Sequence, residues 1–292
     1  MKTNYIENET SNYNNNFIEW DESKEIRESY EKNLWKQNLT CCILHSLQAV
    51  AMLFLGIFSN SSSFKLPLTT IFLNWDDKMP KQELLVRGFT KFAAVCSSFS
   101  WLSAAAHLLV LIFFKTYIND LRKGINRFRW FEYALSSSIM IALIAMLFGM
   151  YDIISLILLM SVNACMNFFG YMMELQNQNT KKTDWTSFYF GCFAGIIPWA
   201  CILSYLIGCG NLSNVPGFVW GILVAYLIMF NSFPVNMTLQ YLKCYRWSDD
   251  YWGFRMGGYY FGEKVYQILS LTAKSLLIWL VFGGTNQPNP YI

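Results

Sequence analysis

The sequence is poor in charge. Only 14% of its 292 residues are Asp, Glu, Lys or Arg, well below the roughly 25% of a soluble domain. Hydrophobic residues make up 54%, so an ordinary soluble globule is excluded. The net charge of +3 does not supply the clustered basic surface that binding to nucleic acid requires.

Other signals are missing as well. The eight cysteines contain no CxxC pair, which argues against a disulfide framework and a zinc site, and we expect them to be small core residues.

No apolar signal sequence precedes the hydrophobic segments, because the first 37 residues are charged and rich in Asn. We expect residues 1–37 to form a poorly ordered cytoplasmic tail, with a short amphipathic stretch over 20–35. No motif indicates an enzyme or a metal site.

Long apolar runs are plentiful. Seven are long enough to cross roughly 30 Å of hydrocarbon at about 1.5 Å per residue. They are residues 38–58, 89–114, 130–151, 153–173, 188–207, 217–241 and 261–282. The pattern predicts an all-α membrane protein, a seven-transmembrane helix bundle over 38–282, which crosses the plasma membrane or another cellular membrane. The third and fourth spans meet at Asp152 and must form a tight helical hairpin.

The cations predict the orientation of the bundle, because Lys and Arg accumulate in cytoplasmic segments. Sixteen lie in the amino-terminal tail and in the loops after the second, fourth and sixth spans, against five in or beside the first loop. This distribution predicts a cytoplasmic N terminus and an extracellular C terminus, with residues 283–292 as an extracellular tail. The topology is inverted relative to the usual receptors and proton pumps with seven helices.

The first outer loop, residues 59–88, is long and contains an alternating apolar stretch over 64–75. Alternation predicts a strand or hairpin on the outer surface, with a role in subunit contacts within a homodimer. An irregular cap is the alternative interpretation.

Lys274 is the residue that best indicates the function. It lies about 20 Å into the last span, counted from residue 261 at 1.5 Å per residue, too deep to reach the interface comfortably. A lysine there costs on the order of 3 kcal/mol. One explanation is a structural ion pair with a buried acid. The other is an amine suited to Schiff-base formation with an aldehyde, which in a seven-helix bundle suggests retinal.

A protonated retinal Schiff base is a buried cation and needs an anion nearby. Glu132 is the best candidate, and Ser136 continues its helix face. Hydropathy starts this span at Trp130, which would leave Glu132 at the membrane interface. We therefore expect the third helix to begin earlier, near Leu121.

Two motifs together resemble the heliorhodopsins, a family of retinal proteins distant from the ion-pumping rhodopsins. They are RWFEYxxSSSxM over residues 129–140 and LSLxAKS over 269–275. The resemblance runs through all seven spans and implies a rhodopsin-like fold with the inverted topology. It also implies all-trans retinal bound covalently to Lys274 as a protonated Schiff base, with Glu132 as counterion. Ordinary pumps have a carboxylate four residues before the lysine, where this chain has Ser270.

The resemblance extends to further residues. His45 and His107 lie at matching depth in the first two spans, and with Ser103 and Arg129 they would form a polar cavity that accepts the Schiff-base proton. The walls of the retinal pocket would come from several helices. They are Tyr133, Ser136, Asn163, Met166, Trp199, Phe230, Phe233 and Ser270.

Three classes of function are open. The first is a light sensor with a slow photocycle, which signals without pumping ions to an unidentified cytoplasmic partner. The second is light-driven or light-gated proton transport, and the third is a helix bundle without a chromophore. The stretch 276–282 has no ionisable side chain, and Glu174 and Asp152 lie at helix ends, so a continuous proton path is disfavoured and sensing is the leading interpretation.

Overall fold

A computed structural model describes residues 3–58, 65–75, 80–180, 182–208 and 210–286. Within these residues, seven helices are long and apolar enough to cross a membrane. They are α1 (Thr3–Phe58), α2 (Phe92–Ile112), α4 (Arg127–Leu147), α5 (Ile153–Gln176), α6 (Thr186–Ile207), α7 (Gly217–Leu242) and α9 (Gly257–Thr285). The prediction of seven membrane-spanning helices is confirmed.

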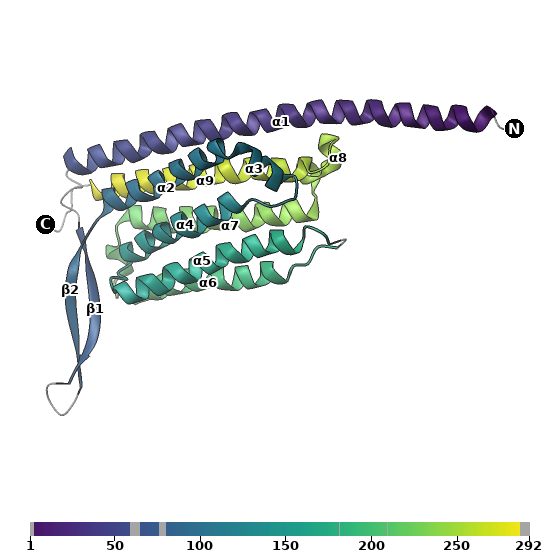
Figure 1. The fold of residues 1–292 in the computed structure, drawn as a ribbon. Coiled ribbons are helices and arrows are strands. Elements are labelled where there is room, and N and C mark those ends of the chain that lie inside the picture. The colour runs from purple at the N-terminus through teal and green to yellow at the C-terminus, as the bar shows by residue number, and fades with distance from the viewer. Residues whose placement is uncertain (1–2, 59–64, 76–79, 181, 209, 287–292) are drawn as a thin grey trace.

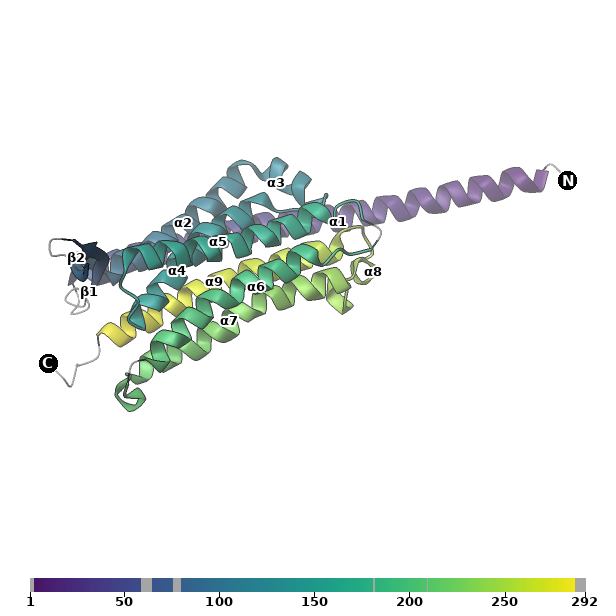
Figure 2. The ribbon, with the colours of Figure 1, turned by 90° about the horizontal axis from the view of Figure 1, so that it is seen from below.

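The seven helices run side by side in one bundle (Figures 1 and 2). Helix α1 packs on α2, α4 on α5, α5 on α6, and α7 on α9. Two short helices, α3 (Phe114–Leu121) and α8 (Asp249–Trp252), lie at one end, which we call the α3–α8 end. A β-hairpin marks the other, the hairpin end, where α9 finishes.

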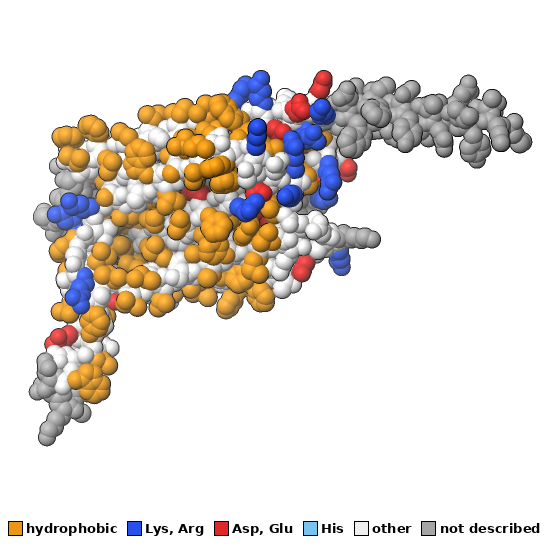
Figure 3. Space-filling view, in the orientation of Figure 1, with side chains coloured by type: hydrophobic (Ala, Val, Ile, Leu, Met, Phe, Trp, Pro, Cys, Tyr) orange, Lys and Arg blue, Asp and Glu red, His pale blue; other side chains and the backbone are white. Residues whose placement is uncertain are grey.

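The outside of the bundle is apolar along its length, and charged side chains gather toward its two ends (Figure 3). Large hydrophobic side chains on the spans are exposed, among them Phe54 at 62%, Phe193 at 69% and Ile228 at 65%. In water such a surface would be costly, whereas in lipid it is the expected exterior. The chain is therefore an integral multi-pass membrane protein.

Helix α1 differs from the prediction of a poorly ordered tail. It runs without a break through the boundary at residue 37 and extends past the α3–α8 end (Figure 1). Leu34 is buried at 1% exposure, and Glu31 accepts hydrogen bonds from Arg122 and Tyr260. The amphipathic pattern over 20–35 thus marks a helical segment that docks on the bundle, at least from residue 24 onward.

The predicted outer loop contains a hairpin and not an irregular cap. Strand β1 (Lys65–Asn74) pairs antiparallel with β2 (Lys81–Lys91), with a register shift at Leu68 and Thr69. At the shift, the Thr69 amide donates to the carbonyl of Tyr151 at 2.9 Å, which ties the hairpin to the loop between α4 and α5. Beyond this tie the hairpin extends away from the bundle (Figure 1).

The predicted start of the third span near Leu121 is wrong. Helix α3 ends at Leu121, and Gly124 then takes a positive φ of 76°, a conformation that glycine adopts easily and that a continuous helix cannot contain. Asn126 caps α4, since its side chain accepts from the Arg129 amide. The tight α4–α5 hairpin is confirmed: α4 ends at Leu147, and Asp152 caps α5.

The expectation for the cysteines is only partly met. Cys41 and Cys96 are buried, but Cys165, Cys192 and Cys244 are exposed. Cys165 and Cys192 lie within spans, where lipid covers a small apolar side chain as well as protein does, so hydropathy alone could not separate the two environments. Cys209 lies outside the described residues.

Candidate functional site

Lys274 and Glu132 meet inside the bundle. The Lys274 ammonium donates hydrogen bonds to Glu132 Oε1 and to Ser270 Oγ, each at 2.7 Å. Ser103 Oγ donates to the same Glu132 oxygen at 2.7 Å. All four residues are buried, with Lys274 at 3% and Glu132 at 9% exposure. This is a desolvated ion pair, strengthened by a hydroxyl at each partner.

Local helix geometry explains the arrangement. Ser270 lies four residues before Lys274 on α9, so its hydroxyl lies on the same face, one turn away. Glu132 lies only five residues after the start of α4. It is nevertheless deep in the bundle, since α4 begins inside the protein: Arg129, two residues after that start, is already buried. Counted from the hairpin end, Glu132 is about 22 Å and Lys274 about 16 Å along their helices. The two depths therefore agree without an earlier helix start.

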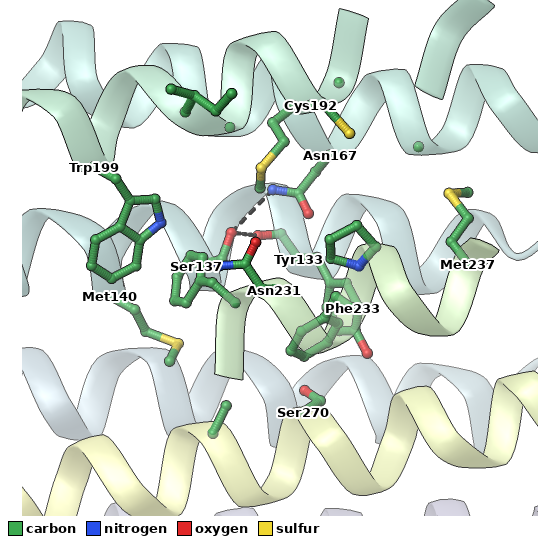
Figure 4. Close-up of a pocket in the computed structure, with 18 of the residues that line it drawn as sticks. Tyr133, Ser137, Met140, Asn167, Cys192, Trp199, Asn231, Phe233, Met237 and Ser270 are labelled. Atoms are coloured by element: carbon green, nitrogen blue, oxygen red, sulfur yellow. Dashed lines mark hydrogen bonds between the residues drawn. The ribbon is translucent and has the colours of Figure 1, made fainter. Parts of the chain in front are cut away.

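Next to this pair, a cavity of about 520 Å³ lies between α4, α5, α6, α7 and α9. Of the predicted wall residues it is lined by Tyr133, Ser136, Met166, Trp199, Phe230, Phe233 and Ser270, and Lys274 lines it too. Figure 4 shows Trp199 and Phe233 facing into the space from different helices. Most of the wall is apolar or aromatic, as in pockets that bind an elongated hydrophobic ligand.

The aromatic wall is held by edge-to-face contacts. Trp199 meets Phe230 with ring centroids 5.5 Å apart, and Tyr133 meets Phe233 at 5.4 Å with an interplanar angle of 89°. The Tyr133 hydroxyl donates to the backbone carbonyl of Tyr266 at 2.9 Å, which links α4 to α9. These contacts fix the walls before any ligand enters.

Asn163 does not line the cavity. It is buried at 1% exposure behind the wall, where its amide donates to Ser137 Oγ at 2.7 Å and to Ser138 Oγ at 3.1 Å. Ser137 and Asn167 form the wall here instead, joined by a hydrogen bond of 3.1 Å (Figure 4). The helical face was predicted correctly, but the choice between two positions one turn apart was not.

The two histidines lie together, as their matching depth predicted. Their rings stack with centroids 5.7 Å apart. His107 Nδ1 lies 2.8 Å from Asn38 Oδ1, whereas neither nitrogen of His45 has a hydrogen-bond partner among the described residues. A cavity of about 30 Å³, enough for a water molecule, is lined by His107, Glu132 and Arg129 but not by His45.

Arg129 lines the small cavity with His107, as predicted, but its ion pairs are with two acids that the prediction did not include. Its guanidinium forms ion pairs with Glu174 of α5 and Glu263 of α9, and all three side chains are at most 3% exposed. It also lies over the Tyr266 ring, 4.1 Å from the centroid. From the sequence, Glu174 was placed at a helix end, and Glu263, an acid at the start of the last apolar run, was overlooked.

The fold and the buried amine–carboxylate pair define a rhodopsin-like membrane protein with seven helices. Among solved structures, the chain is similar to a light-driven proton pump, LR (Mac), from Leptosphaeria maculans. The TM-score is 0.56 at 11% identity, and the match covers 85% of this chain and 94% of the other. At this identity the likeness shows the fold alone. A search of curated proteins found no significant match.

The chain belongs to the heliorhodopsin family, which it matches over residues 34–286. Family and fold together support a light-responsive protein that binds retinal. The residues present fit such a chromophore, because one amine lines a cavity of about 520 Å³ with aromatic walls, beside a single carboxylate. Among the described residues, no group of three or more His, Cys, Asp or Glu is placed to hold a metal ion.

Proposed function

We propose that the chain is a light sensor that holds all-trans retinal on Lys274 as a protonated Schiff base and does not pump ions. Bound retinal would supply absorption of visible light and a change of shape on isomerisation. Glu132 would balance the positive charge at the Lys274 nitrogen, with Ser270 and Ser103 positioning the pair. The aromatic walls would select an elongated apolar ligand.

One observation carries the proposal that no ion crosses the bundle. Among the described residues, no Asp, Glu, Lys, Arg or His is buried between the Lys274–Glu132 pair and the hairpin end. That half is a packed apolar core, and on α9 it contains Leu277, Ile278 and Val281, each at most 1% exposed. A proton path through this half would have buried hydroxyls, such as those of Ser97 and Ser100, but no ionisable side chain to carry the proton.

The opposite half is rich in ionisable groups. Arg129, Glu174 and Glu263 are buried between the pair and the α3–α8 end, and buried His45 and half-buried His107 lie beside the pair. In the inverted topology that we propose, this end faces the cytoplasm, so a proton leaving Lys274 would stay among these groups and return to it. The movement of this proton would rearrange side chains at the α3–α8 end during a slow photocycle. A cytoplasmic partner would bind to the rearranged surface.

Illumination should therefore produce no net pH change in a suspension of vesicles and no steady photocurrent under voltage clamp. The His45→Ala/His107→Ala variant should leave the dark spectrum nearly unchanged but alter the rate at which it recovers after a flash. The histidines lie beside the ion pair and make no hydrogen bond to it. A sustained photocurrent that reverses with the proton gradient would establish the alternative, light-driven or light-gated proton transport.

We also propose that the hairpin contributes to a homodimer. A two-stranded sheet alone is marginally stable in water, and this one exposes Ile71, Phe72, Leu73 and Leu84 by 49–62%. The Ile71→Glu/Leu84→Glu variant places charges on one cross-strand pair of this surface and should convert a dimer to monomers in light scattering of the protein in detergent. The Glu83→Gln variant, which changes one charge on the other face of the hairpin, is the control. A dimer unaffected by the double substitution would place the interface elsewhere.

A further inference from the structure

The cluster of Arg129, Glu174 and Glu263 is built from three helices and takes no part in the proposed attachment of retinal. Arg129 comes from α4, Glu174 from α5 and Glu263 from α9. Their side chains are 0–3% exposed, so water does not screen their charges. Lys274 is already paired with Glu132, and no second cation contacts the two glutamates among the described residues.

The charges in this cluster do not balance. One guanidinium faces two carboxylates, which leaves a net charge of −1 if both acids are ionised. A buried charge without a partner is strongly unfavourable, and a carboxyl group in that position normally takes up a proton instead. The other buried ionic contacts provide the contrast, because Glu132 and Glu31 are each matched by at least one cation.

Hydrogen bonds show where a proton can be placed. The four carboxylate oxygens accept from nitrogen donors on Asn126, Arg129, Trp130 and Gln267. Each of these oxygens thus already accepts at least one hydrogen bond. Tyr259 and Tyr117 also lie near, with hydroxyls 2.9 Å from Glu174 and 3.1 Å from Glu263. A hydroxyl can turn and accept a hydrogen bond from a protonated acid, which an amide or guanidinium N–H cannot do.

A second observation points to the same place. Gln267 is 95% buried beside Glu263, and its Oε1 has no donor among the described residues. Gln267, Tyr117 and Glu263 all line the 30 Å³ cavity that also reaches Glu132. Buried acceptors normally have a hydrogen-bond donor. An acceptor that lacks one is expected where the site binds one more proton than its fully ionised groups carry.

We infer that the Arg129–Glu174–Glu263 cluster is a proton-binding site that holds one proton in the dark, shared between its two carboxyl groups. The ionisable groups that face it are Tyr117 of α3, His107 of α2, Tyr241 of α7, and Tyr259 and Tyr266 of α9. The site is separate from the Lys274–Glu132 pair but shares a cavity with Glu132. It is thus a reservoir on the α3–α8 side of the chromophore.

Infrared spectroscopy of the purified protein in the dark tests the inference. The wild type should show a carbonyl stretch of a protonated carboxylic acid that shifts in D₂O and on labelling with ¹³C-glutamate. Both Glu174→Gln and Glu263→Gln should lose this band, because removing either acid leaves one carboxylate to match Arg129. Glu31→Gln should keep it, since Glu31 is a buried acid already matched by Arg122.

Absence of the band in the labelled wild type would overturn the inference, and this result needs no variant to fold. A band that survives in either single Gln variant would also overturn it, because the proton would then belong to another acid. The cluster includes neither Lys274 nor Glu132, so the band should persist in Lys274→Ala/Glu132→Gln, which has no attachment point for retinal and no unpaired acid in place of the Lys274–Glu132 pair. A failure of this inference is thus distinguishable from a failure of retinal binding.

Discussion

Lys274→Ala and Lys274→Arg should each abolish the visible absorption band of protein supplied with retinal, while the chain still inserts into the membrane. Neither side chain can form the imine, although arginine keeps the positive charge beside Glu132. The two variants therefore separate covalent attachment from ion pairing. The measurement is an absorption spectrum of membranes with and without added all-trans retinal. A visible band in either variant would mean that Lys274 is only a structural ion-pair partner.

The thermal stability of the Lys274→Ala variant is a second measurement. Lys274→Ala leaves the Glu132 carboxylate buried without a cation, a change that costs about 3–5 kcal/mol in buried pairs. Adding Glu132→Gln removes the unpaired charge and should recover much of the lost thermal stability. Lys264→Ala is the matched control, because Lys264 is an exposed lysine on the same helix and should change neither the colour nor the stability.

Hydropathy and charge were sufficient to predict the bundle. Each of the seven apolar runs became a helix, because a chain in lipid must satisfy its backbone hydrogen bonds internally. The start of α4 was missed for a local reason. The choice between Leu121 and Trp130 depended on how deep Glu132 had to lie, whereas the break is caused by Gly124 and the Asn126 cap. The inverted topology and the domain boundaries remain predictions.

The site was predictable as far as each helix could be considered alone. A lysine deep in an apolar span is conspicuous in a sequence, and so is an acid near the start of another span. The pairing of Arg129 with Glu174 and Glu263 is not, because it depends on three helices whose relative rotation the sequence does not specify. For the same reason Asn163 was placed in the cavity wall in place of Asn167.

Glu132→Gln should shift the absorption maximum to longer wavelength, lower the pH at which the visible band disappears, or do both. In the structure Glu132 Oε1 accepts from both Lys274 and Ser103 at 2.7 Å, so the carboxylate is the direct partner of the positive charge. Removing the anion favours loss of the proton from a cationic Schiff base. In the protein that stays protonated, the charge is less confined to the Lys274 nitrogen, which lowers the excitation energy.

Spectra recorded across a pH titration of wild type and variant measure both effects. Glu31→Gln is the control, since it removes a buried, ion-paired acid from the α3–α8 end and should leave the spectrum unchanged. If neither the maximum nor the titration moves in Glu132→Gln, the counterion must be another acid. Glu263 would then be the next to test, because it lines the small cavity that Glu132 also reaches.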